Sequence, residues 1–465
     1  MQKKFRLSIL TLSLGLVPAI AMADTNADIL KELEALKAKV QQLEAQVKTQ
    51  QAQIQDNQKA TEEASQVANH AAVQVTGVKS SAETSGLKGL SITGMIAPAY
   101  VYNKDQQNSS FVFLNRSNGD PAASTIYNYD NSSFGQAYIQ FQKVTEGGTK
   151  WTLNLAPDRG TGANMNGNSI INEASVSMPI NGDQNTRLIA GQIPDWEGYE
   201  YVFDNQTKSI THNLLFDFTE LFAYTGAGVD VTNGNLEWKA LVGNVNSPRY
   251  YYNISNGGTG GRAPAAIFRA DYSLPGYDSA GVGFWALVGK TPNLNSAGIG
   301  VSNGTSNTTM FEADGYLNKG NWGYYGQFGA GKQVGAAYNG GDAQWWGLSG
   351  MLTYNYTPRV LSYVRADYLN DSKNGGGLVG GYLTATDPIN GFGPDPVCVN
   401  SGATNCNGAN RYALTLGANY LYSKSTTLKL EYRYDRANMA TFLNVSDGSY
   451  TNNNNLLAAS VVVSF

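Results

Sequence analysis

The chain has 465 residues, of which 52 are glycine and 28 are tyrosine, whereas histidine and cysteine occur only twice each. Only 15% of the residues are charged, against about 25% in an average soluble domain, which argues against a cytoplasmic enzyme and against a small disulfide-stapled domain. The formal net charge of −4 falls to −7 once the three basic residues of the leader are removed, so phosphate backbones would be repelled and no nucleic acid is expected as a partner.

Residues 1–23 have the pattern of a secretory signal peptide. Three basic residues at positions 3–6 precede a largely apolar stretch over residues 7–17, and Ala21-Met22-Ala23 offers the small residues that signal peptidase reads. We expect cleavage before Asp24. A retained membrane anchor is the alternative, but the apolar stretch is too short for a hydrocarbon core of about 30 Å.

Residues 24–85 carry a heptad pattern that predicts a coiled-coil helix followed by a linker. Apolar residues recur at spacings of four and three, which holds one seam of a helix against a partner helix. The strongest layers of the seam are Ile29, Leu33, Leu36, Val40, Leu43, Val47 and Ile54. The alternative is a solvated helix that packs on its own chain.

From residue 86 to residue 465 the hydrophobic pattern changes to a period of two, which predicts an all-β region. Leu428, Leu430 and Tyr432 share one face of a strand, and charged residues occupy the other face. We predict sixteen antiparallel strands, near residues 91–102, 134–143, 150–156, 169–179, 186–193, 224–231, 235–244, 265–274, 279–289, 309–317, 321–331, 344–355, 359–369, 410–422, 426–436 and 455–465.

The connections between these strands alternate in length. They are short after every even-numbered strand, and they are long and rich in glycine, asparagine and serine after every odd-numbered one. Outer-membrane barrels have this asymmetry, with short periplasmic turns and long outer loops, whereas a soluble sandwich has no reason to sort its loops in this way. The predicted fold class is therefore a transmembrane β-barrel of sixteen antiparallel strands, preceded by an α-helical coiled coil.

Residues 90–465 resemble the general porins of Gram-negative bacteria. The resemblance rests on the signal peptide, the sixteen-strand rhythm, the long loop after the fifth strand and the C-terminal run that ends at Phe465. Within it, Gly191-Gln192-Ile193-Pro194-Asp195 followed by Gly198-Tyr199-Glu200 looks like the start of a loop that constricts a pore. The added N-terminal helix is similar to that of the DcaP-like porins.

The resemblance implies a homotrimer in the lipid bilayer of the cell outer membrane, with the N-terminal helix in the periplasm. It also implies a water-filled channel for passive diffusion of small hydrophilic solutes. Three adjoining barrels would bring three helices together, although valine at a and leucine at d favour two strands in isolated peptides. Two alternatives remain open: a substrate-selective channel, for instance for organic acids, and an envelope tether whose coiled coil contacts the cell wall.

The strand face opposite the apolar one supplies the candidate pore-lining residues. These are Glu173, Arg187, Glu237, Lys239, Arg269, Asp271, Glu312, Asp314, Arg365, Asp367, Lys429, Glu431, Arg433 and Asp435. The candidate constriction loop adds Asp195, Glu197, Glu200, Asp204, Asp217 and Glu220. Three Arg-x-Asp pairs in the first set could form dipoles across the lumen, or could simply be ion pairs that fill a wet interior. A mild cation preference follows if the loop acids face the lumen.

Motifs that suggest catalysis are weak in this sequence. Residues 326–333 match a phosphate-binding loop except at Gln333, where magnesium requires Ser or Thr, and they fall on a predicted strand. Residues 300–304 match a nucleophile elbow, but no histidine follows His212. We therefore expect no enzymatic activity, no catalytic residues, no metal and no cofactor.

The two cysteines lie together in the long loop between the thirteenth and fourteenth predicted strands. Cys398 and Cys406 are close in sequence, and exported proteins usually pair such residues in a disulfide. A metal site is the alternative, but no histidine is near.

Overall fold

The computed structural model describes residues 37–38, 88–106, 108–114, 116–117, 134–157, 170–221, 223–246, 264–277, 279–293, 304–378 and 390–465. The chain divides into two compact units, Met1–Gly77 and Val78–Phe465. In the first unit the structure describes Lys37 and Ala38, which are helical. The expected signal peptide and the remainder of the expected coiled coil lie outside the described residues.

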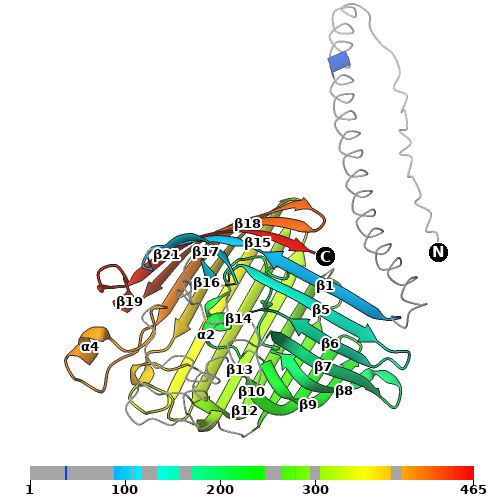
Figure 1. The fold of residues 1–465 in the computed structure, drawn as a ribbon, viewed down its shortest axis with the longest axis horizontal. Coiled ribbons are helices and arrows are strands. Elements are labelled where there is room, and N and C mark those ends of the chain that lie inside the picture. Colours follow the sequence, from blue (N-terminus) through cyan, green and yellow to red (C-terminus); the bar gives the residue numbers. More distant parts are fainter. Residues whose placement is uncertain are drawn as a thin grey trace, which may run out of the picture. The chain divides into compact units, whose positions relative to one another are not determined.

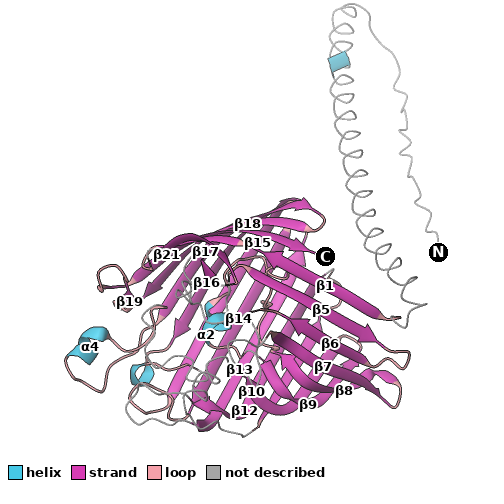
Figure 2. Ribbon diagram, in the orientation of Figure 1, coloured by secondary structure: helices cyan, strands magenta, loops and turns pink. Residues whose placement is uncertain are grey.

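The second unit is an antiparallel β-barrel (Figures 1 and 2). Its wall contains β1 (Leu90–Ala97), β2 (Ala99–Asn103), β3 (Asn108–Phe113), β4 (Arg116–Ser117), β5 (Gln136–Val144), β6 (Lys150–Leu155), β7 (Ile171–Ile180), β8 (Asp183–Pro194), β9 (Ala223–Asn233), β10 (Leu236–Asn246), β11 (Ala265–Ser273), β12 (Ser279–Asn293), β13 (Gly304–Lys319), β14 (Trp322–Gln333), β15 (Ala343–Thr357), β16 (Val360–Asn370), β17 (Arg411–Ser423), β18 (Thr426–Ala437) and β21 (Asn453–Ser464). A small hairpin, β19 (Phe442–Leu443) with β20 (Tyr450–Thr451), and the short helices α2 (Leu214–Phe218), η1 (Lys373–Gly375) and α4 (Pro396–Asn400) lie in the connections.

The barrel is closed by pairing of its first and last strands. Met95 of β1 lies opposite Ser464 of β21, and Tyr100 of β2 lies opposite Ala459. Closure removes the unpaired backbone groups that a hydrocarbon environment cannot satisfy. The expected sixteen-stranded barrel is thereby confirmed, with β1 and β2 acting as one wall strand that is divided at Pro98 because proline has no N–H to donate.

The first hairpin differs from the expectation. The sequence pattern suggested a long link between residues 102 and 134, but the chain turns back within a few residues and β3 pairs with β2, with Val112 opposite Ala99. The next wall strand along the chain is β5, which pairs with β1. Leu114 N donates to Gly135 O at 2.7 Å where the two halves meet. Thus β3 and β5 together form the second wall strand, and β4 is a two-residue addition beside β3.

The outer face of the barrel is apolar. In β18, Leu430 is 54% exposed, whereas its neighbour Glu431 is 1% exposed, as the period-two pattern predicts. Near the short turns the outward face carries a run of packed aromatic rings, in which Trp322 lies 4.6 Å from Tyr354 and Tyr354 lies 4.9 Å from Tyr356 between ring centroids. Aromatic girdles of this kind mark the level of the lipid headgroups. Among the described residues, no helix is long and apolar enough to cross a membrane.

Candidate channel constriction

Residues 195–221, here called the constriction loop, connect β8 to β9 and fold into the barrel, where α2 lies (Figure 1). The helix begins because Asn213 accepts a hydrogen bond from Phe216 N at 2.9 Å, which satisfies one of the free donors of its first turn. All five residues of α2 are buried. A loop placed in this way must bury many backbone polar groups, and each needs a partner.

Glu431 on β18 is the hydrogen-bond partner of some of these backbone groups. Its carboxylate accepts from Ile210 N at 2.7 Å, from Thr211 N at 3.1 Å and from Tyr363 Oη at 2.7 Å. Because a buried carboxylate is stable only when its lone pairs are satisfied, the loop and the wall strand stabilise each other.

Arg365 on β16 binds the next part of the loop. Its guanidinium donates to Glu200 at 2.9 Å, to the carbonyl oxygen of Thr211 at 2.8 Å and to that of His212 at 2.7 Å. The same guanidinium also donates to Asp367 at 3.2 Å. Five donors in a rigid fork suit a site where several acceptors converge.

Lys429 and Arg433 complete the attachment. Lys429 Nζ donates to the carbonyl oxygens of Asp204 and Ser209 at 2.5 and 3.0 Å. Arg433 donates to His212 O at 2.8 Å and to Asp435 at 3.1 Å. We call the six residues of this wall region the loop anchor: Arg365, Asp367, Lys429, Glu431, Arg433 and Asp435.

The placement of the loop anchor corrects the sequence-based expectation for six candidate pore-lining residues. They do point inward, but each is at most 5% exposed, because the constriction loop covers them. The sequence pattern shows which side of the wall a residue occupies, whereas a loop far away in sequence determines whether that side is open to water. The second interpretation considered above, ion pairs that fill the interior, describes two of the three Arg-x-Asp pairs, Arg365 with Asp367 and Arg433 with Asp435.

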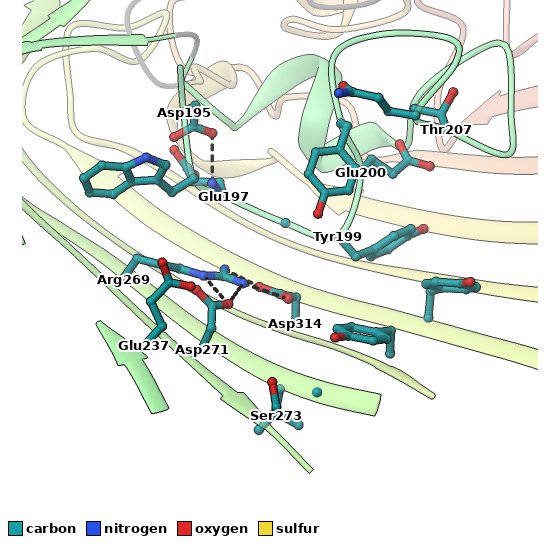
Figure 3. A pocket seen from close by; sticks show the side chains of 18 of the residues that line it. Asp195, Glu197, Tyr199, Glu200, Thr207, Glu237, Arg269, Asp271, Ser273 and Asp314 are labelled. Atoms are coloured by element: carbon teal, nitrogen blue, oxygen red, sulfur yellow. Dashed lines mark hydrogen bonds and ion pairs between the residues drawn. The ribbon is translucent and has the colours of Figure 1, made fainter. Parts of the chain in front are cut away.

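The residues of the opposite wall line a cavity of about 590 Å³ (Figure 3). Glu237 and Lys239 of β10, Arg269 and Asp271 of β11 and Asp314 of β13 face it. Figure 3 shows Glu237, Arg269, Asp271 and Asp314 on one side and Asp195, Glu197 and Tyr199 of the constriction loop on the other. Five of the fourteen predicted pore-lining residues thus line the cavity.

Arg269 is held between two carboxylates. It donates to Asp271 at 2.5 and 2.9 Å, and it also pairs with Asp314 on β13. The guanidinium can cross the intervening strand because Gly283 has no side chain, and a Cβ there would lie 2.1 Å from Arg269 Nη2. Lys239 Nζ lies 3.0 Å from Glu237. The acids of the cavity wall therefore hold both basic residues in place.

The three remaining predicted lining residues lie away from the cavity. Arg187 donates to Ser177 Oγ at 2.7 Å and to Gly148 O at 2.7 Å, near the short turns. Glu173 accepts from Ser175 Oγ at 2.5 Å on the same strand. Glu312 is 2% exposed and does not line the cavity.

The constriction-loop acids also divide into two groups. Asp195, Glu197 and Glu200 line the cavity, whereas Asp204, Asp217 and Glu220 are buried away from it. Glu220 accepts from Gln327, and Asp217 lies 3.8 Å from Arg433. The condition stated for a cation preference, that the loop acids face the lumen, is therefore met at the cavity by three of the six.

Burial controls the protonation of the loop acids. Loss of hydration raises the pKa of Asp195 to about 6, although Tyr224 and two backbone N–H groups oppose the rise. It raises the pKa of Glu200 to about 7, against the opposing effect of Arg365. The pKa of Glu197 is raised well above its usual range by burial and by the neighbouring charge of Asp195.

Two features of the interior were missed by the sequence analysis. Aromatic rings, including Trp196, Tyr199, Tyr316 and Tyr325, line the cavity together with the acids. Toward the long loops the inward-facing side chains are apolar, and they form one buried cluster with α2 that includes Leu241, Ile267, Leu287, Met310 and Leu369. The alternation of polar and apolar residues along the sequence gave little indication of these two features. A strand with apolar side chains on both faces shows no alternation.

Those motifs resembling catalytic sites that lie in the described part of the chain have structural roles. Residues 326–333 lie within β14 and pair with β13 and β15, so they form no phosphate-binding loop. His212 stacks on Phe216 with ring centroids 3.9 Å apart, and its Nε2 lies 2.6 Å from Tyr201 O. His70 and residues 300–303 lie outside the described part of the chain. In the described part, no group of His, Cys, Asp or Glu has the geometry of a metal site.

Cys398 of α4 and Cys406 form a disulfide, with an S–S distance of 2.11 Å and a Cα–Cα distance of 5.8 Å. Asp395 precedes α4 and accepts from Val397 N at 3.0 Å. The disulfide closes residues 398–406 into a ring within the connection between β16 and β17, on the long-loop side of the barrel.

A family model described as "Protein of unknown function (DUF3138)" matches residues 55–465. The chain belongs to the DUF3138 family. No curated protein matches it. The DUF3138 description assigns no activity, so the fold and the cavity carry the functional argument.

The solved structures similar to this DUF3138 protein include outer-membrane proteins, channels and porins. OmpT of Vibrio cholerae aligns with a TM-score of 0.48 at 10% identity, covering 81% of this chain and 97% of that one. The outer-membrane channel DcaP of Acinetobacter baumannii gives the same values. An anion-selective porin from Comamonas acidovorans gives a TM-score of 0.47 at 12% identity, covering 81% and 99%. The resemblance to porins including DcaP is confirmed, as a likeness of fold.

Proposed function

We propose that this protein is an outer-membrane porin, a channel for passive diffusion of small hydrophilic solutes with a mild preference for cations. The observation that carries the proposal is the charged cavity of about 590 Å³ between the constriction loop and the barrel wall. A barrel of sixteen strands is wide enough to enclose an aqueous passage. A loop fixed inside it narrows that passage to the size of small solutes.

The charge of the cavity supports the cation preference. Six acidic side chains line it, at Asp195, Glu197, Glu200, Glu237, Asp271 and Asp314. Three basic residues face them, at Lys208, Lys239 and Arg269. A low-dielectric wall focuses this net negative potential into the passage, which raises the local concentration of cations. The same surplus argues against the alternative of an organic-acid channel.

Conductance measurements test the proposal. Full-length protein purified from membranes and inserted into planar bilayers should give discrete conductance steps in KCl. In a KCl gradient, the reversal potential should have the sign of K⁺ preference. A protein that inserts, resists heat like a folded barrel and yet gives no steps would refute the channel. A reversal potential of the opposite sign would refute the cation preference alone.

The proposal includes the remaining parts of the chain. Residues 1–23 would be removed on export, residues 24–85 would form a periplasmic coiled coil, and the barrels would assemble as a homotrimer in the outer membrane. Deleting residues 24–85 separates this function from the tether alternative. A channel keeps its unit conductance without these residues, whereas loss of envelope integrity, measured as detergent sensitivity of the cells, would support a tether.

A further inference from the structure

Aromatic rings line the cavity beside its charged residues and offer solutes a second kind of contact. Tyr199 of the constriction loop lies with its ring centroid 5.8 Å from that of Tyr325 on β14, and its hydroxyl lies 2.8 Å from Ser349 Oγ. Tyr316 on β13 lines the cavity and remains 39% exposed. The faces of such rings carry negative potential and attract cations.

The protein's own Lys239 illustrates how an ammonium group is held here. Its Nζ lies 5.9 Å from the ring centroid of Trp196 and 3.0 Å from a carboxylate oxygen of Glu237. The ammonium is therefore placed between an aromatic ring and an acid. Tyr316 and Tyr325 on β13 and β14 line the same cavity as Asp271 and Asp314, so the cavity offers the same two group types to a solute.

The basic residues of the cavity do not cancel its acids. Arg269 is shared by two carboxylates, and Lys239 is matched by one. Burial lowers the pKa of the Lys208 ammonium, and burial together with the neighbouring charge of Asp195 raises the pKa of Glu197 well above its usual range. Asp271, which is 38% exposed at its side chain, keeps a carboxylate in contact with the open part of the cavity.

We propose that the cavity binds organic cations in which an ammonium group is joined to an aromatic ring. Resting on the proposed channel function, this inference names the class of solute that the constriction retains. The ammonium would lie against the carboxylates of β11 and β13, and the ring would lie against the tyrosines of β13 and β14. An organic anion of the same shape would be repelled by the same carboxylates.

Block of the KCl current tests the inference. Phenethylammonium added to one side of a bilayer at pH 8 should interrupt the current of the full-length channel in a concentration-dependent way. Phenylacetate, which has the same ring with the opposite charge, and neutral 2-phenylethanol should block far less. Ethylammonium, which lacks the ring, separates the contribution of the tyrosines from that of the charge.

Two variants locate the site. Asp271→Asn removes one carboxylate and should weaken block by phenethylammonium about fivefold, the effect of one charge at close range in a partly hydrated site. Tyr316→Leu should weaken block by phenethylammonium more than it weakens block by ethylammonium. The matched control is Glu146→Gln, whose side chain is 87% exposed on a short turn outside the cavity.

The outcomes distinguish failure of the channel from failure of the organic-cation site. Absence of any KCl conductance would refute the channel itself. Conductance with equal block by phenethylammonium and phenylacetate, or with block that neither cavity variant alters, would overturn the organic-cation site and leave the channel intact. Heat-modifiable migration on gels verifies that each variant barrel is folded, and a variant that fails this test is replaced by Glu237→Gln on the same wall.

Discussion

Arg269 and Arg365 have the same local sequence, each followed two residues later by an aspartate, and both point into the barrel. Their surroundings give them different roles. Arg269 faces an open cavity and balances two wall carboxylates, whereas Arg365 is fully buried and binds the backbone of the constriction loop. At the scale of the residue, the protein uses inward charges both as a solute-facing surface and as attachment points for a loop.

Glu431 provides a direct test of the loop anchor. In Glu431→Gln, one oxygen that accepts backbone N–H groups becomes an NH₂ donor, which leaves buried donors of Ile210 or Thr211 unpaired. We expect a loss of about 1–3 kcal/mol of stability and a noisier open-channel current as the loop loosens. Heated-gel unfolding and single-channel noise measure the two effects. Noise equal to that of Glu146→Gln would show that Glu431 does not fix the loop.

The pH dependence of selectivity follows from the raised pKa of Asp195, about 6, and of Glu200, about 7. Both carboxyls are ionised at pH 8 and largely neutral at pH 5, so the cavity loses negative charge on acidification. We expect the preference for K⁺ over Cl⁻ to fall between pH 8 and pH 5. Reversal potentials in a fixed KCl gradient measure this. A preference that rises or stays constant over that interval would contradict the assignment.

At the scale of the element, short segments inside the connections are fixed by a few contacts. The constriction loop is held by α2 and the loop anchor. In the loop that carries α4, the disulfide closes residues 398–406 into a ring. Phe218 of α2 also lies with its ring centroid 4.6 Å from that of Phe392, which comes from the α4-bearing loop. The two loops therefore support each other inside the barrel.

The state of the cysteines can be measured on protein purified without reductant. Because the loop between β16 and β17 would face the oxidising exterior, we expect Cys398 and Cys406 to be joined in the mature protein. Alkylation under denaturing conditions should then add no label, and reduction beforehand should allow two labels, as read by intact mass. Two labels without reduction would contradict the pairing.

At the scale of the whole molecule, the barrel and the N-terminal region are expected to act together in assembly. Trimeric barrels would place three N-terminal helices close to one another, and the resulting high effective concentration would favour three strands over the two that valine at a and leucine at d prefer. Full-length Leu36→Cys treated with a trifunctional thiol crosslinker should therefore give a trimer band. A ladder that ends at dimer would overturn the threefold assembly.

Much of the fold could be predicted from the sequence because a membrane barrel imposes strong local rules. Each strand must show lipid-facing apolar residues at every second position, and each must end in a connection of the proper length. Leu430 and Glu431 obey this rule directly, with one side chain exposed and the next buried. The first hairpin escaped prediction because β3 has only six residues, too few to show a clear period.

The sequence by itself determined which residues face lipid, which face inward, and that the barrel closes with sixteen strands, since alternation along a strand is a local property. The tertiary structure alone decided which inward charges meet water. Arg365 and Glu431 became loop attachments, and Arg269 and Asp271 became cavity walls, because the constriction loop covers one side of the lumen and leaves the other open. That choice depends on contacts between residues more than 150 positions apart, such as Glu200 with Arg365, which no periodicity records.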